Sequence, residues 1–592
     1  MTEPGTTRRR RRRATSRRLR RILLAGLVVT SVLLLTAGWV GYRGWRAHGH
    51  LTSAAAMTRQ LGGEVFDGDR DRAHRTLAAL QEQTASARSA TADPGWWLGA
   101  HVPYSGDDLA AVRDVAVAVD DLARHAFPAL LRIDPAVLVP RSGRFDVARL
   151  RAAATSIDEA DRAVRRVRTR MQGVPDGKLL PQVRSAVVAL RDELAELGTV
   201  TGGASTAARL LPALLGGDGR RNYLLVSQNP AELRATGGMF GAYTLVQVTD
   251  GRLRLVRQGA STEMGQFDPP VLPLNAELRG LYRDLPGIYP ADVNLTPHFP
   301  TAAALYREMY RRYSGTSVDG VLAIDPVMLS YLLEATGPVA VPKHTTLVAG
   351  TVTRSLLSDS YQRLDPREQD KYFAASAMAV FNSLLSRTVD PRAMLAAVDR
   401  AVTERRLLFW SARPAEQREM AGTRVGGVLP ERETTPTVGV FLNDGSGAKL
   451  GWYLHPAAEL TVGDCRPDGR RDLRLRVTLR SAAPRSGLAK SVTGLAMSGD
   501  PYTARTLVNV HSPVGGAVVA ARLDGRPIGV GSGVERGRPV AIANVEVRPG
   551  TTRTLEITLL TPVGAGDAAD LWLTPAAHPW TTRIQPASTC DQ

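Results

Sequence analysis

Hydrophobic and polar residues follow four patterns along the chain, and each pattern predicts a region. Residues 22–42 are apolar with no charged position. From 51 to 215 apolar residues recur every three or four positions, which predicts a helical stalk or bundle. From 220 to 428 strand-like and helix-like segments alternate, as in an α/β core domain. From 435 to 585 a period of two predicts a β-sandwich domain, so we expect a multidomain α+β protein.

The start of the α/β region holds two predicted strands, Tyr223–Ser227 and Tyr243–Val248, which are rich in β-branched and aromatic residues. Between them lies a polar loop, Gln228–Gly238, with one acid, one arginine and a Gly-Gly pair. Rigid strands on both sides would position such a loop for function. The alternative is a structural turn in which Arg234 pairs with Glu232 or stays in solvent.

Further along the α/β region, helix signals stand between apolar runs. Asp325-Pro326 opens a helix that ends at Gly337, because Asp caps a helix start and Gly its end. The run Val318–Ile324 before it predicts a strand. A charged segment, Ser358–Lys371, leads into a long helix over Tyr372–Leu385.

The C-terminal region carries the signals of antiparallel strands. Apolar residues alternate with polar ones from Leu473 to Leu479, which predicts a half-buried strand. Asp524-Gly525 and Pro549-Gly550 lie between apolar runs and predict hairpin turns.

The uncharged segment Ile22–Tyr42 is long enough to cross the roughly 30 Å hydrocarbon core of a bilayer as a helix. Residues 1–21 hold ten arginines against one glutamate, and Trp39, Tyr42 and Trp45 mark the other end. The positive-inside rule makes 1–21 a basic cytoplasmic tail and places the bulk of the chain outside the cell membrane. A cleaved signal peptide is the alternative, but no small-residue cleavage pattern follows the apolar run.

The formal net charge of +18 does not by itself indicate a nucleic-acid partner. Residues 1–21 supply +9 of it, and the other 571 residues share the remaining +9. Neither a basic stripe with aromatic residues nor a known nucleic-acid module is present. We therefore expect a membrane partner and no nucleic acid.

Two cysteines, Cys465 and Cys590, are the only ones in the chain. An even count in an exported protein predicts a disulfide between them. The ten histidines show no metal-binding spacing, and no phosphate-binding glycine motif follows a strand.

The segment Pro94–Gly106 interrupts the predicted stalk helices with the adjacent pair Trp96 and Trp97. Two tryptophans in a row bind a sugar or a lipid surface in some proteins. The alternative is that they pin a helical hairpin together or lie near the membrane.

Several segments resemble the bacterial DUF4012 family, whose function is unknown. They are QNPAELRATGGMFGAY, ADVNLTPHFPTAAALY, VDGVLAIDPVMLSYLLEATGPV, ERRLLFWSARPAEQ and FLNDGSGAKLGWYL. The resemblance extends over about residues 220–585. It implies a membrane-anchored envelope protein, typically actinobacterial or from other bacteria, often associated with exported polysaccharide and without an established activity.

The order of elements is also similar, more distantly, to the LytR–CpsA–Psr phosphotransferases. Those enzymes move glycans from polyprenyl-pyrophosphate carriers, hold the pyrophosphate with arginines and hold magnesium with an acid. Guanidinium groups bind phosphate oxygens in pairs, and carboxylates bind hard cations. The resemblance implies that the pyrophosphate ligands in this chain are Arg234, Arg257, Arg363 and Arg367. It implies Asp292 or Asp359 as the magnesium ligand.

Two departures from the phosphotransferase pattern leave the catalytic residues unknown. Asn229 stands where an acid is expected at the end of the first strand, and only QGAST follows Arg257 where an arginine–acid pair is expected. We therefore expect a binding or scaffolding role in cell-envelope or exopolysaccharide assembly, with a polyprenyl-linked glycan or another envelope component as partner. The alternative is a LytR–CpsA–Psr-like phosphotransferase.

Overall fold

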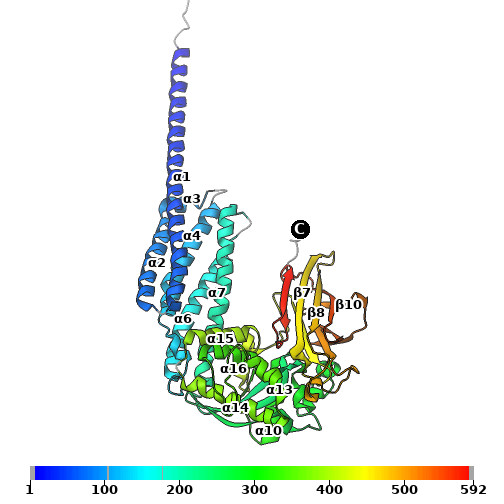
Figure 1. Cartoon of the computed structure of the whole chain (residues 1–592). Coiled ribbons are helices and arrows are strands. Elements are labelled where there is room, and N and C mark those ends of the chain that lie inside the picture. Colours follow the sequence, from blue (N-terminus) through cyan, green and yellow to red (C-terminus); the bar gives the residue numbers. More distant parts are fainter. Residues whose placement is uncertain (1–6, 68, 103–105, 176–177, 388, 586–592) are drawn as a thin grey trace, which may run out of the picture. The chain divides into compact units, whose positions relative to one another are not determined.

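The computed structural model describes residues 7–67, 69–102, 106–175, 178–387 and 389–585. The chain forms two compact units (Figure 1). The first contains residues 1–134 and 149–209, and the second contains 135–148 and 210–592. The protein is a multidomain α+β protein, as the sequence predicts.

The first unit is helical. A long helix, α1, packs along α2, and a buried cluster of alanine, leucine, valine and methionine side chains joins the later helices. The helices are α1 (Thr7–Asp67), α2 (Arg70–Ala90), α3 (Pro94–Gly99), α4 (Gly106–Asp121), α5 (Phe127–Leu131), α6 (Val147–Gln172) and α7 (Pro181–Leu214).

The predicted membrane span 22–42 lies inside α1. Among the residues that the structure describes, no helix combines the length and the apolar character needed to cross a membrane. The side chains of residues 22–26, 28, 29 and 33 are outside the described part of the chain, so the membrane span stays a prediction.

The second unit contains a five-stranded sheet in the order β3-β2-β1-β4-β5. β1, β2 and β3 form an antiparallel meander, β4 lies parallel to β1, and β5 is antiparallel to β4. The strands are β1 (Arg221–Arg234), β2 (Gly237–Thr249), β3 (Arg252–Ala260), β4 (Gly320–Ile324) and β5 (Leu408–Ser411).

Helices cover both faces of this sheet. Phe299, Tyr306 and other apolar residues of α10 pack against β1 and β2 on one face, and the end of α7 with α16 packs on the other. The helices are α8 (Ala276–Tyr282), α9 (Leu285–Ile288), α10 (Phe299–Ser314), α11 (Pro326–Thr336), α12 (Val352–Arg354), α13 (Ser360–Arg363), α14 (Pro366–Ser386), α15 (Pro391–Thr403) and α16 (Pro414–Ala421).

The helix signals of the α/β region are confirmed. Asp325 caps α11 by accepting a hydrogen bond from the amide of Met328 at 2.8 Å. Gly337 ends the same helix with a φ of 75°, a left-handed conformation that glycine adopts without steric cost.

The prediction of a loop over Gln228–Gly238 is wrong for most of that segment, which is β-strand. β1 continues to Arg234, and the turn to β2 is reduced to Ala235 and Thr236. Two register shifts, at Ser227/Gln228 and Asn229/Leu233, let this polar segment stay paired with β2. The segment is held extended because other parts of the unit bury it on its second side.

The C-terminal region is a β-sandwich of two sheets whose inward-facing residues share one hydrophobic core. Strand orders are β11-β10-β14-β8-β7-β16 and β12-β13-β9-β6-β15. The strands are β6 (Thr437–Asp444), β7 (Leu454–Cys465), β8 (Arg471–Ser481), β9 (Ala504–His511), β10 (Ala517–Leu523), β11 (Arg526–Pro527), β12 (Gly531–Glu535), β13 (Arg538–Val547), β14 (Thr552–Leu560), β15 (Asp570–Leu573) and β16 (Thr581–Gln585).

One of the two predicted hairpin turns is confirmed. Asp524 and Gly525 join the antiparallel strands β10 and β11 with φ values of 50° and 76°. The hairpin predicted at Pro549-Gly550 is wrong: Gly550 makes a turn with a φ of 73°, but this turn carries the chain from β13 in one sheet to β14 in the other. Cys465 ends β7, whereas Cys590 lies outside the described residues, so the disulfide stays a prediction.

The α/β core and the sandwich are joined within the second unit. Leu233 of β1 and Tyr361 of α13 are buried members of the sandwich's own hydrophobic cluster. We call the contact region between them the seam: β1 residues 228–234 and the following turn, covered by residues 443–452 and 574–576.

Candidate functional site

Arg234, the first predicted pyrophosphate ligand, is a buried residue of the seam. Its Nη2 lies 3.0 Å from Oδ1 of Asp292, and its Nε donates to the carbonyl of Ala291 at 3.0 Å. Its Nη1 donates to the carbonyls of Leu233 at 2.9 Å and Asp444 at 3.4 Å. All three nitrogens of the guanidinium group are therefore used inside the protein.

The surroundings of this ion pair are polar and closed. Asn294 is fully buried and donates from Nδ2 to Thr236 Oγ1 and to the carbonyl of Gly238, both at 2.8 Å. Burial raises the pKa of Tyr306, against the opposing charge of Arg234. The pair Arg234–Asp292 therefore closes the tip of the β1–β2 hairpin against the short helical turn Pro290–Leu295.

The expected alternative partner of Arg234, Glu232, pairs with another residue. Nζ of Lys449 lies 2.7 Å from Oε1 of Glu232 and 4.9 Å from the ring centroid of Tyr361. Asn229 donates from Nδ2 to Glu232 at 3.3 Å and to the Tyr361 hydroxyl at 3.0 Å. Burial raises the pKa of Glu232, and the charge of Lys449 opposes that rise.

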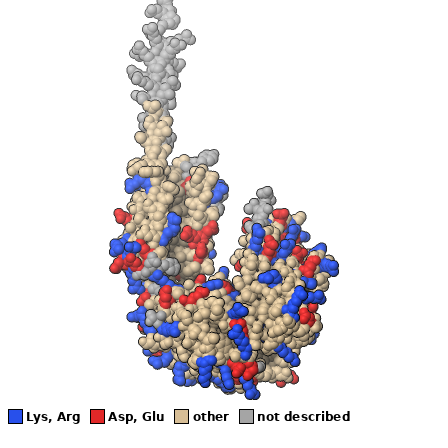
Figure 2. Space-filling view, viewed as in Figure 1, with Lys and Arg blue, Asp and Glu red and all other residues tan. Residues whose placement is uncertain are grey.

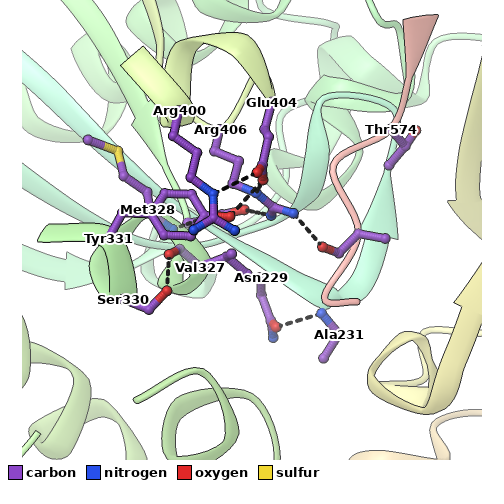
Figure 3. A network of polar contacts seen from close by, with 12 residues as sticks. Asn229, Ala231, Val327, Met328, Ser330, Tyr331, Arg400, Glu404, Arg406 and Thr574 are labelled. Carbon is purple, nitrogen blue, oxygen red and sulfur yellow. Dashed lines mark hydrogen bonds and ion pairs between the residues drawn. The ribbon is translucent and has the colours of Figure 1, made fainter. Parts of the chain in front are cut away.

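A second buried ion network, drawn in Figure 3, was not predicted from the sequence. Arg406 donates from Nη1 to Asp325 at 2.7 Å and from Nε to Glu404 at 2.6 Å. Its Nη2 donates to the carbonyl of Ala576 at 3.0 Å. Burial opposes the charge of Arg406, but Asp325 and then Glu404 outweigh it and raise its pKa. This network ties the start of α11 to a C-terminal segment of the sandwich.

Arg400 and Tyr331 complete the network in Figure 3. The hydroxyl of Tyr331 donates to Glu404 at 2.7 Å, and Arg400 Nε donates to Glu404 at 3.1 Å. The guanidinium carbon of Arg400 lies 3.9 Å from the centroid of the Tyr331 ring, which is a cation–π contact. Each charged side chain of this network, Arg400, Glu404 and Arg406, is paired inside the protein, so we assign the network a structural role.

The other three predicted arginines are exposed. Arg257 lies on β3 and donates from Nη2 to the hydroxyl of Tyr313 at 3.0 Å, with its guanidinium 5.2 Å from that ring. Arg363 ends α13, and Arg367 lies in the first turn of α14. Within the described part of the chain, none of the three forms an ion pair.

These exposed arginines lie on elements that are neighbours in space. α14 packs against β3. Partial burial, and then the charge of Glu263, raise the pKa of Asp370, which follows Arg367 by three residues. Glu263 in turn accepts from the Tyr313 hydroxyl at 2.9 Å. We call Arg257, Arg363 and Arg367 the exposed arginine set.

The two predicted magnesium ligands, Asp292 and Asp359, each form an ion pair with a different arginine. Asp292 pairs with Arg234, and Asp359 lies 3.5 Å from Nε of Arg354. Among the residues that the structure describes, no group of three or more carboxylate, histidine or cysteine side chains forms a metal-binding cluster. Each acid is already held by a guanidinium group, so we derive no step through magnesium.

A surface pocket of about 600 Å³ lies at the turn between β7 and β8. Arg466, Arg474 and Asp472 contribute to its lining, and none of the predicted phosphate or magnesium ligands does.

Solved structures give only weak likenesses to this chain. An M1 zinc metallopeptidase mutant from Deinococcus radiodurans, bound to a Tyr-Ser-Ala substrate, is 16% identical over 18% of this chain and 20% of its own, with a TM-score of 0.12. A putative nutrient binding protein from Legionella pneumophila is 5% identical over 21% and 42%, with a TM-score of 0.15. A two-domain M1 zinc metallopeptidase mutant bound to L-arginine is 17% identical over 20% and 23%, with a TM-score of 0.12.

This chain therefore spans about a fifth of the length of the first peptidase, and TM-scores this low carry no argument. A comparison with curated proteins gives no significant match. The likeness to LytR–CpsA–Psr enzymes stays a prediction.

A family comparison covers the centre of the molecule. The family described as "Protein of unknown function (DUF4012)" matches residues 218–361, a shorter range than the expected 220–585. The matched range contains β1 to β4 with α8 to α12, and thus Arg234, Asp292 and the seam residues of β1. Residues 218–361 of this chain match the DUF4012 family, which is the resemblance that the sequence motifs indicate.

Proposed function

We propose that this protein is a single-pass, membrane-anchored envelope protein whose bulk lies outside the cytoplasm. Its second unit binds an anionic envelope component, such as a polyprenyl-linked glycan, and acts in envelope or exopolysaccharide assembly. The carrying observation is the exposed arginine set, three guanidinium groups on the neighbouring elements β3, α13 and α14.

The anchor is supported by the exposed apolar side chains of α1. Leu27, Leu34 and Leu35 are each more than 65% exposed although they belong to a long helix. The visible face of this stretch carries no charge, whereas both charge signs are mixed over the rest of the face that Figure 2 shows. A helix that is apolar on its exposed faces is stable in lipid and unfavourable in water.

The binding role is supported by how the arginines are used. A guanidinium group that is free of carboxylates offers its paired N–H donors to phosphate oxygens. Arg257, Arg363 and Arg367 are exposed and lack such partners among the described residues. Arg234, in contrast, would have to break its bonds to Asp292 and three carbonyls before it could hold a ligand.

A LytR–CpsA–Psr-like transferase is the weaker candidate for the same reason. Such chemistry needs free arginines and an available acid close together, because positioning and charge neutralisation supply most of the catalysis. Here the central arginine and acid, Arg234 and Asp292, neutralise each other.

The test is native mass spectrometry of the detergent-extracted full chain, with and without added polyprenyl pyrophosphate. We expect the parent protein to retain the lipid and a triple variant, Arg257→Gln, Arg363→Gln and Arg367→Gln, to lose it at least tenfold. The matched control removes three exposed arginines of the sandwich, Arg522, Arg526 and Arg548.

Loss of the lipid in the first triple variant alone supports the site, and a transfer assay with magnesium then becomes worthwhile. If both triple variants retain the lipid equally well, the proposed site is overturned, and any lipid binding is explained by non-specific charge attraction. Absence of lipid from every sample overturns lipid binding and leaves a scaffolding role.

A further inference from the structure

The adjacent tryptophans of α3 have opposite environments. Trp96 is 2% exposed, and its Nε1 donates to the carbonyl of Leu109 at 3.0 Å. Trp97 is 54% exposed, and its ring stacks at a tilt on His101 with centroids 4.4 Å apart. Trp96 therefore holds α3 against α4, whereas most of the Trp97 side chain is open to the surroundings and does not serve that packing.

The short helix α3 is also fixed to α1, at the end of the predicted membrane span. Asp93 caps α3 by accepting from the Trp96 amide at 2.8 Å. The same carboxylate accepts from Nε1 of Trp39 at 3.1 Å and pairs with Nε of Arg43 at 2.7 Å. Arg43 donates as well to the carbonyls of Ser89 and Ala90 at the end of α2. These bonds hold α3 beside Trp39 and Arg43.

Exposed apolar side chains gather at this level of the first unit. Trp97, Leu98 and Val102 are each at least half exposed. Half or more of the surface of Trp39 and Trp45, and nearly half of that of Tyr42, is open on α1 as well. Aromatic rings with one polar atom favour the boundary between lipid headgroups and acyl chains.

We infer that Trp97, Leu98 and Val102 form a second membrane contact, which lies in the headgroup region of the outer leaflet beside the anchor. This inference rests on the proposed membrane anchor. A helix rises about 1.5 Å per residue, so residues 22–42 span roughly 30 Å and bring Trp39 to Trp45 to the outer boundary. The bonds of Asp93 then place α3 at the same depth.

A lipid surface fits this patch better than a sugar or a protein partner does. Sugar recognition needs several polar side chains around a stacking ring. Among the described exposed residues beside Trp97, Leu98 and Val102 are apolar and only His101 is polar. One side of the Trp97 ring already contacts His101. With two membrane contacts, one along α1 and one on α3, the first unit would hold a fixed tilt on the bilayer.

The test uses spin labels on the full chain reconstituted in lipid nanodiscs. Separate variants carry the label at Leu98→Cys on α3, at Leu34→Cys in the anchor and at Val188→Cys on the exposed side of α7. The parent protein, which carries none of these three substitutions, gives the background signal of the label. Collision rates with oxygen, which enriches in lipid, and with a nickel chelate, which stays in water, report the depth of each label.

We expect a deep position for Leu34→Cys, an interfacial one for Leu98→Cys and an aqueous one for Val188→Cys. The oxygen-to-nickel collision ratio at Leu98→Cys should exceed that at Val188→Cys severalfold. A deep label at Leu34→Cys with an aqueous label at Leu98→Cys overturns the second contact and keeps the anchor. An aqueous label at Leu34→Cys overturns the anchor itself. If the labels at all three positions lie in lipid, the proposed contact of α3 with the headgroup region is overturned, because the control position on α7 is then immersed as well.

Discussion

Arg234 has a different role in the structure from the one that its sequence context predicts. In the sequence it is an arginine in a polar segment between two strands, which is typical of a ligand-binding loop. In the structure it is the buried partner of Asp292 and donates to three carbonyls. The sequence identified the residue as important, but not the partners that decide its role.

The first residue-scale prediction follows from this burial. Arg234→Gln should lower the free energy of unfolding by about 2–4 kcal/mol, because it leaves the Asp292 carboxylate and buried carbonyls without a donor. Arg257→Gln, at an exposed position, should change it by less than about 0.5 kcal/mol. Denaturant titration of both variants in detergent checks this, and equal stability of the two would contradict a structural role for Arg234.

The second residue-scale prediction concerns His298, a buried residue directly before α10. Its Nδ1 accepts from the amide of Leu429 at 3.0 Å, so that nitrogen carries no proton. Burial, and then the charge of Arg536, lower the pKa of His298 to about 3, against the opposing charge of Glu535. The folded protein therefore keeps this imidazole neutral.

Because the unfolded histidine titrates near pH 6.5, it takes up a proton that the folded one refuses. The stability contributed by His298 is complete above that pH and falls as the pH drops towards 3. We expect a loss of about 2 kcal/mol at pH 5 relative to pH 8. His298→Asn keeps an acceptor without titrating, and its unfolding free energy should depend less on pH. An unchanged pH dependence would refute the assignment.

At the scale of elements, the seam depends on a close approach of two backbones. A Cβ atom added to Gly451 would lie 2.6 Å from the carbonyl oxygen of Ala231 and 2.9 Å from that of Pro230. Only glycine allows the short helical turn Leu450–Tyr453 to lie on β1 at this distance.

Gly451→Ala should therefore lower the free energy of unfolding by about 1–3 kcal/mol, since backbone must move to relieve the overlap. Gly529→Ala is the matched control, because nothing lies within 4 Å of a Cβ at that position. Thermal unfolding of both variants distinguishes them. Equal melting temperatures would show that the seam tolerates an extra methyl group.

Elements with local signals were predictable from the sequence, and those held by distant partners were not. Asp325 and Gly337 delimit α11 because caps act within one turn of a helix. The strand β1 outruns its apolar pattern because Lys449, Asn443 and Thr574 supply partners from more than 200 residues away. No periodicity in the segment itself carries that information.

The same limit applies to the candidate site. The exposed arginines were identifiable by residue type, and their surface positions on β3, α13 and α14 follow from the fold. Lys449 was missed, although it is one of only five lysines beside seventy arginines. The network of Arg406 was missed as well, because Ala576 contributes only a backbone carbonyl.

At the scale of the whole molecule, the α/β core and the sandwich should behave as one body. The ion pair of Glu232 with Lys449, the hydrogen bond from Arg406 to the carbonyl of Ala576 and a shared hydrophobic cluster join the two parts. We expect that a protease site inserted between the exposed residues Thr434 and Thr435 can be cleaved without separating the two parts.

After cleavage, the fragments should still elute together in gel filtration and unfold in a single thermal transition. The same cleavage in the Gly451→Ala variant should release more of the C-terminal fragment. Separation of the parent's fragments under native conditions would contradict a rigid seam.

The seam also bears on inheritance. The family match ends at residue 361, at the Tyr361 whose hydroxyl accepts a hydrogen bond from Asn229 of β1. A gene fragment cut at that limit would encode β1 with Leu233 and Ala231 only partly covered, because Leu357 and Tyr361 would remain but the covering residues of 443–452 and 574–577 would be lost. Recombination could not pass the matched region alone to another protein in folded form. A lineage that carries this β1 sequence must therefore carry a covering partner with it, and the two should be gained or lost together.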